Sequence, residues 1–149
     1  GIFEGSTINT PSMICVEDAI DALSWVESIG GTNELIKISK ENLQIVTKWV
    51  KSSDWIKFMC NEAKTRSSTS ITLQIKDEWF NKFSEDEQKD LIKKIVSKLY
   101  EEGVVHDING YPKAPPSLRL WGGPTVNNSD MKILLPWIDW AYYKIKNNV

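Results

Sequence analysis

The sequence has eighteen basic side chains in its 149 residues, and only two of them are arginines, Arg66 and Arg119. A guanidinium group presents a planar set of N–H donors that fits a carboxylate or phosphate through two parallel bonds, whereas a lysine ammonium is a point charge. Lysine fills the other sixteen positions. We therefore expect at least one arginine to bind an anion. The alternative is that both form structural ion pairs.

Arg119 lies within Leu118-Arg119-Leu120-Trp121, a short apolar run typical of a strand. Alternate side chains of a strand face opposite ways, so inward-facing leucines would direct the arginine to the other side of a sheet. Gly122-Gly123-Pro124 follows and leaves room for a ligand to approach. Arg119 is therefore the preferred anion-binding residue.

Two other polar segments could take part in binding. Arg66 lies in Thr65-Arg66-Ser67-Ser68-Thr69-Ser70, at the entrance to an alternating strand, where it can either hold an anion or brace a loop through backbone carbonyls. Near the start of the chain, the segment 7–12 carries Asn, Thr and Ser side chains, the short donors that a phosphate pocket uses. The alternative for that segment is a loop that ends in the N-cap Ser12.

Composition excludes several classes of protein. The net charge is −2 and the sequence pI is about 5.5, without the basic stripe of a nucleic-acid-binding protein. No segment reaches the about 18 apolar residues of a membrane span and no signal peptide opens the chain, so we expect a cytoplasmic protein without membrane contact.

Few residues have the spacing of a metal site or a catalytic motif. Cys15, Cys60 and the lone His106 do not have metal-ligand spacing, so we expect no metal site and free thiols in apolar surroundings. The chain also has no paired-carboxylate motif, Walker loop, HExxH or GxSxG. An independent hydrolase or kinase is therefore not supported.

Four helices and four strands are predicted to position these residues. The helices run from Val16 to the stop at Gly30-Gly31, over 33–51, over 84–102 with a Ser84–Glu87 capping box, and from about Ser129, with Pro136 predicting a kink or restart. The strands are expected at 55–59, 70–76, 104–108 and 117–121.

The order of these elements lacks strict βαβ alternation. It favours an α/β (α+β) fold in which a mostly antiparallel sheet of about four strands is covered by helices. Residues 1–15 are predicted to be an extended segment and residues 16–149 the domain. Because the first twelve residues lack structure of their own, we expect the chain to continue a longer protein.

Several segments together resemble the C-terminal portion of the phosphoserine aminotransferase family. The matching stretches are 7–13, 16–18, 25–31, 65–70, 118–126 and 135–141. The family consists of fold-type I enzymes that use pyridoxal phosphate, usually as homodimers. They exchange an amino group between glutamate and 3-phosphohydroxypyruvate in serine biosynthesis, and some act in pyridoxine synthesis. The resemblance implies the small C-terminal domain of such an enzyme.

The resemblance also implies roles for individual residues. Arg119 would hold the α-carboxylate of the substrate, while Asn9 and Thr10 would contact the cofactor phosphate across the dimer interface. Arg66 lies in a matching motif and is a further substrate-binding candidate. Some relatives have a His-Arg pair for the substrate phosphate where this chain has Tyr111-Pro112-Lys113, so Lys113, or alternatively His106, would replace it.

The family's Schiff-base lysine belongs to a large domain that this sequence does not include. The resemblance therefore implies no catalytic residue here, an extended segment that docks on the missing large domain, and a fragment that is inactive alone. Two rival hypotheses are a stand-alone α/β module that binds an amino-acid or keto-acid ligand and an interaction domain without a ligand. The coding sequence upstream of Gly1 would distinguish them.

Overall fold

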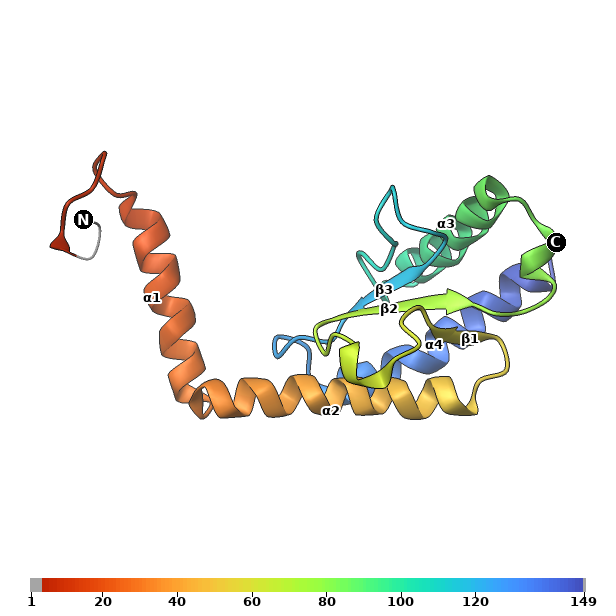
Figure 1. The fold of residues 1–149 in the computed structure, drawn as a ribbon, viewed down its shortest axis with the longest axis horizontal. Helices are drawn as coiled ribbons and strands as arrows, with labels where there is room; N and C mark the ends of the chain where they lie inside the picture. The colour runs from red at the N-terminus through yellow and green to blue at the C-terminus, as the bar shows by residue number, and fades with distance from the viewer. Residues whose placement is uncertain (1–3, 149) are drawn as a thin grey trace. The chain divides into compact units, whose positions relative to one another are not determined.

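The computed structural model describes residues 4–148 and divides into two compact units, Gly1–Ile36 and Lys37–Val149. The first unit contains α1 (Met13–Ser28) and the beginning of α2 (Gly31–Ser52), which continues into the second unit (Figure 1). The second unit contains a sheet and the helices α3 and α4, and the buried apolar side chains found among residues 4–148 all belong to it.

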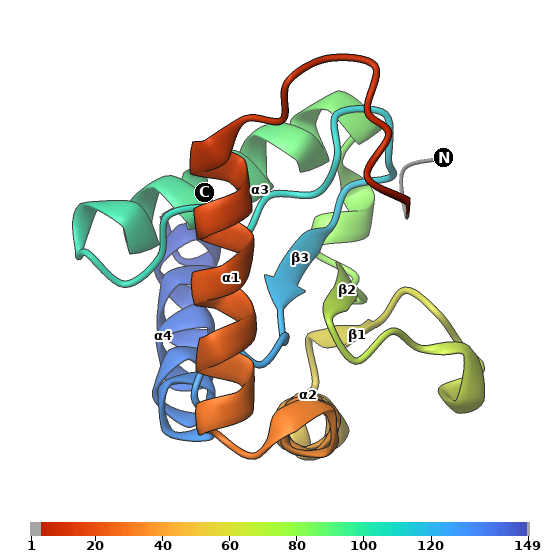
Figure 2. The same ribbon diagram turned by 90° about the vertical axis from the view of Figure 1, so that its left-hand side faces the viewer.

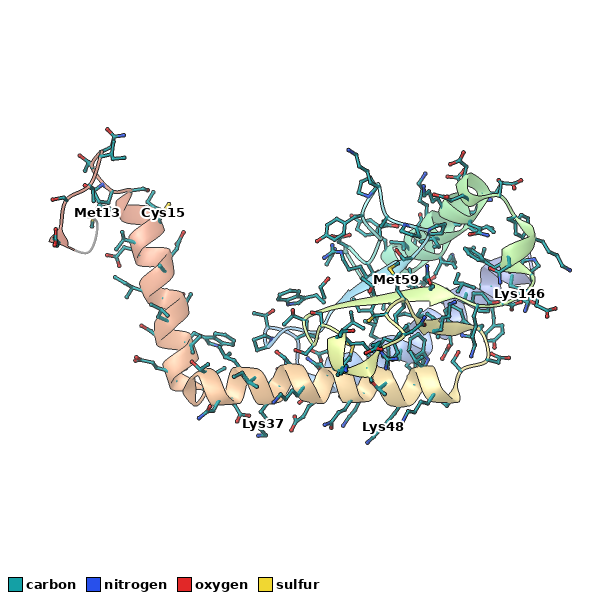
Figure 3. The ribbon with its side chains drawn as sticks, viewed as in Figure 1. Met13, Cys15, Lys37, Lys48, Met59 and Lys146 are labelled. Atoms are coloured by element: carbon teal, nitrogen blue, oxygen red, sulfur yellow. The ribbon has the colours of Figure 1, made fainter. Side chains whose placement is uncertain are left out.

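Helix α1 begins at Met13, three residues before the predicted start. It ends as predicted, because Gly30 and Gly31 adopt φ values of 114° and 73°, a left-handed conformation that glycine tolerates. No residue of α1 is buried. The free thiol of Cys15 is exposed on this helix (Figure 3), so its predicted apolar surroundings are wrong.

The sheet of the described residues has three antiparallel strands in the order β1-β2-β3, namely β1 (Ile56–Phe58), β2 (Ser70–Ile75) and β3 (Leu118–Trp121). The fourth predicted strand, at 104–108, is wrong. Val105 and Ile108 are buried while the two residues between them are exposed, and this spacing of three does not fit the alternation of a strand. A single bridge pairs Asn109 with Leu118 instead.

Helices α3 (Glu85–Glu101) and α4 (Asn128–Lys146) lie together on one side of the sheet (Figure 2). The predicted capping box at the start of α3 is confirmed. Helix α4 continues through Pro136 without the expected restart. Pro136 has no N–H, so the Lys132 carbonyl loses its helical hydrogen-bond partner. Both residues are exposed, so water can satisfy that carbonyl. Single-turn 3-10 helices also lie at Ala63–Thr65 and Phe80–Lys82.

The core lies between the sheet and the helices. Leu73, Ile95 and Ile138, from β2, α3 and α4, are each 0% exposed. The further buried apolar side chains are Val46, Trp55, Ile56, Phe58, Ile71, Ile75, Phe80, Leu91, Ile92, Val96, Leu99, Val105, Ile108, Leu118, Leu120, Met131, Leu135, Ala141 and Tyr142. No helix among the described residues is long and apolar enough to span a membrane.

Two carboxylates secure α4 against its neighbours. Asp139 accepts the indole N–H groups of Trp49 on α2 and Trp55 before β1, both at 2.8 Å. Near the end of α4, Lys146 (Figure 3) and Tyr142 both donate to Asp77. Burial raises the pKa of the Asp77 carboxyl, but these two donors, the backbone N–H of Trp79 and the charge of Lys146 together outweigh burial and hold the pKa below its usual value.

Candidate functional site

Arg119 occupies the middle of β3, opposite Thr72 of β2. Its neighbours Leu118 and Leu120 are each 1% exposed and belong to the core. Since alternate side chains of a strand face opposite sides, the arginine lies on the sheet face away from α3 and α4. The facing predicted from the sequence is therefore confirmed.

The guanidinium of Arg119 meets two residues of the segment that follows α3. Its Nη2 donates to Asp107 Oδ2 at 3.1 Å, and its central carbon lies 4.8 Å from the centre of the Tyr111 ring. The arginine side chain is 20% exposed, whereas that of Asp107 is 67% exposed. The Arg119 N–H also donates to the Ile108 carbonyl at 2.9 Å, which fixes this segment along β3.

One buried donor of this guanidinium, Nε, has no partner. In the part of the chain that the structure describes, Arg119 Nε is the one buried side-chain nitrogen or oxygen without a hydrogen-bond partner. Buried polar groups almost always have partners, and an unpaired one costs on the order of 1–3 kcal/mol. Nε and Nη2 form the edge of a guanidinium that donates two parallel hydrogen bonds to a bound carboxylate. Asp107 uses one half of that edge, so the other half fits a further acceptor.

The turn after β3 is packed tightly against the sheet. A Cβ atom on Gly122 would lie 2.8 Å from both the Ser68 carbonyl oxygen and Ile71 Cδ1, so only glycine fits. The fully buried Asn42 of α2 donates to the carbonyls of Gly122 and Val126 at 3.2 and 2.9 Å. Asn42 therefore fixes the turn three residues from Arg119.

Sequence reasoning missed Asn42, although a signal for it exists. Val46 follows it by four residues and Trp49 by seven, so Asn42 lies on the apolar stripe of α2. A polar residue on such a stripe must find hydrogen-bond partners in the interior. That requirement singles out Asn42 but does not identify its partners.

A cleft of about 450 Å³ lies between α3 and the loop 109–117. Tyr111, whose ring covers Arg119, contributes to its wall together with three prolines of the loop. Lys89 and Lys93 line its other side, paired with Glu85 and Asp90 of their own helix. Lys113 is exposed in the same loop but does not line the cleft.

Arg66 makes the bracing contacts that were one of its two predicted roles. Its Nε and Nη2 donate to the carbonyls of Cys60 and Asn61 at 3.0 and 3.1 Å. Its central carbon lies 4.0 Å from the centre of the Phe58 ring. These contacts fix the 60–66 loop against β1. The predicted substrate role of Arg66 stays a prediction.

The remaining candidates have less defined surroundings. Asn9 and Thr10 are exposed in the non-helical segment of the first unit, and their contact with a cofactor phosphate stays a prediction. His106 is exposed, with its ring edge-on to that of Tyr100. Among residues 4–148, no group of three or more His, Cys, Asp or Glu side chains could hold a metal ion.

Comparison with known proteins identifies relatives of this chain. No family model matches the sequence. The phosphoserine aminotransferase of Methanosarcina mazei is 42% identical over 145 residues, and that of Methanosarcina barkeri is 41% identical over 145 residues. Both alignments cover 97% of this chain and 36% of the relative, so the chain spans little more than a third of the length of these proteins.

Solved structures agree with the sequence comparison. The phosphoserine aminotransferase from Bacillus circulans subsp. alkalophilus matches with a TM-score of 0.77 and 17% identity, over 96% of this chain and 36% of that one. A phosphoserine aminotransferase structure that records radiation damage of its Schiff base has a TM-score of 0.75 and 19% identity, with 99% and 36% coverage. The chain is therefore a homologue of one part of phosphoserine aminotransferases and has the fold of that part.

Proposed function

We propose that the chain is the C-terminal, substrate-orienting part of a phosphoserine aminotransferase, in which Arg119 binds the α-carboxylate of the substrate. The observation that carries this proposal is the Nε–Nη2 edge of Arg119, of which Asp107 uses only the Nη2 half while the buried Nε has no partner. A substrate carboxylate would satisfy the buried Nε. Two hydrogen bonds from an arginine on a strand would also fix the direction in which the substrate α-carbon points. Such orientation of the reacting atom contributes to catalysis.

Pyridoxal phosphate, when bound, supplies the electron sink that allows amino transfer. The side chains of Asn9 and Thr10 offer an amide and a hydroxyl donor on exposed backbone, and this donor set fits a phosphate group. We propose that they contact the cofactor phosphate, in a homodimer from across the interface. The Schiff-base lysine would come from the large domain outside this sequence, so the chain alone would be inactive.

The proposed substrates are glutamate and 3-phosphohydroxypyruvate, in a cytoplasmic enzyme of serine biosynthesis. Of the two candidates for the substrate phosphate, Lys113 is favoured. It lies two residues from Tyr111, whose ring contacts the Arg119 guanidinium, and its ammonium is exposed. His106 is the alternative and lies beside Asp107 in the same segment.

An Arg119→Lys substitution in the full-length enzyme tests the carboxylate role. Lysine keeps the charge but loses the two-bond geometry, which contributes on the order of 1.5–3 kcal/mol when shielded from water. We expect the affinity for glutamate in the half-reaction to fall by about 10- to 150-fold, with the cofactor absorbance spectrum unchanged.

Arg66→Lys separates the two roles predicted for the other arginine, bracing a loop and binding the substrate. Because Arg66 donates to the carbonyls of its own loop, this substitution is expected to lower stability and leave the affinity for glutamate unchanged. Unchanged half-reaction kinetics in Arg119→Lys would rule out the proposed role of Arg119. A loss of glutamate affinity in Arg66→Lys, with the fold intact, would instead support the substrate role predicted for Arg66.

A further inference from the structure

We infer that Asp107 is an exchangeable internal ligand of Arg119, which the substrate carboxylate must displace. This inference rests on the carboxylate role proposed for Arg119. It adds a specificity-determining residue to the site: a carboxylate of the chain itself that competes with the substrate for the same guanidinium edge.

The contact between the two side chains is incomplete. Asp107 Oδ2 accepts one bond from Nη2 at 3.1 Å, while Nε on the same edge has no partner. A carboxylate that reaches both nitrogens would gain a second charge-assisted bond that Asp107 does not make. A carboxylate placed to hold the arginine permanently would be expected to use both.

Asp107 is also held loosely. Its side chain is 67% exposed, against 20% for Arg119, so solvent weakens the pair and the carboxylate can turn into water at little cost. It belongs to the irregular segment between α3 and β3 rather than to a helix or strand. Buried Ile108 anchors the backbone on the next residue, so the side chain can leave without moving the core.

Tyr111 completes the arrangement. The centre of its ring lies 4.8 Å from the guanidinium carbon, so the ring covers one face of the guanidinium, while the residue as a whole is 63% exposed. Because Nε is buried, a ligand can reach it only if a neighbouring side chain moves, and Asp107 and Tyr111 both contact the guanidinium. The charge of Asp107 makes its exit the step that depends on the ligand's own charge.

The test measures maleate, an unreactive dicarboxylate, binding to the full-length enzyme by isothermal titration calorimetry. Asp107→Asn removes the competing charge at nearly constant shape, and Asp107→Ser removes it with a smaller side chain. We expect both variants to bind maleate about two- to fivefold more tightly, the factor that corresponds to an exposed ion pair. The KM for glutamate should fall by a similar factor while kcat stays nearly constant.

Glu101→Gln is the charge control, because Glu101 lies at the end of α3 and pairs with Lys98 rather than with Arg119. It should leave maleate binding unchanged. Weaker or unaltered binding in both Asp107 variants, with Arg119→Lys still impaired, would overturn the inference and show that Asp107 only supports the arginine. Maleate binding that is unchanged in Arg119→Lys would instead refute the proposed function itself.

Discussion

The buried amide of Asn42 gives a prediction whose size follows from its contacts. In Asn42→Ala, the carbonyls of Gly122 and Val126 lose their donor, and Asn128 loses the Asn42 oxygen that accepts its amide at 2.8 Å. An unpaired buried group costs about 1–3 kcal/mol. Water entering the vacated space and the higher helix propensity of alanine recover part of this cost. The net loss is expected to be about 2–4 kcal/mol, a large share of typical domain stability.

The assay is urea unfolding of the chain, followed by circular dichroism at 222 nm and evaluated by linear extrapolation. Asn33→Ala is the control, because Asn33 is exposed on the same helix and should change stability by less than about 0.5 kcal/mol. Asn42→Asp keeps the size of the side chain but replaces the donor with an acceptor, and it should destabilise at least as much as alanine. If Asn42→Ala matches the Asn33 control, the reasoning about buried hydrogen bonds at this turn is wrong.

Two further predictions concern stability. The pKa of Asp77 is lowered from 3.8 in the fold, so its bond to Lys146 stabilises the protein at neutral pH and is lost as the pH falls through the folded value. Asp77→Asn should therefore lower the free energy of unfolding by about 2 kcal/mol at pH 7 and by progressively less below about pH 4. If urea unfolding gave a difference between the two proteins that does not change with pH, this explanation would be contradicted. Gly122→Ala places a methyl group against the Ser68 carbonyl and should lower the unfolding free energy by about 1–3 kcal/mol, whereas an unchanged denaturation midpoint would show that the turn can shift without cost.

Local signals predicted most of the elements correctly. The capping box before α3, the two glycines after α1 and the alternation of β2 each depend on residues close together in sequence, and all three are confirmed. The strand predicted at 104–108 is wrong. The apolar residues of this segment are of types common in strands, but the spacing of the buried Val105 and Ile108 requires an irregular path. The restart predicted as one alternative at Pro136 does not occur for a related reason, because the cost of a helical proline depends on whether the affected carbonyl meets water.

The sequence by itself determined the likeness to phosphoserine aminotransferases, the four helices, three of the strands and the outward facing of Arg119, because periodicity and motif spacing are properties of neighbouring residues. Only the tertiary structure decided what that arginine meets. Asp107 is twelve positions away and Asn42 is eighty positions from the turn it secures, and such pairs come together only when the core closes. The half-used guanidinium edge depends on burial and geometry, and neither is encoded in the identity of a single residue.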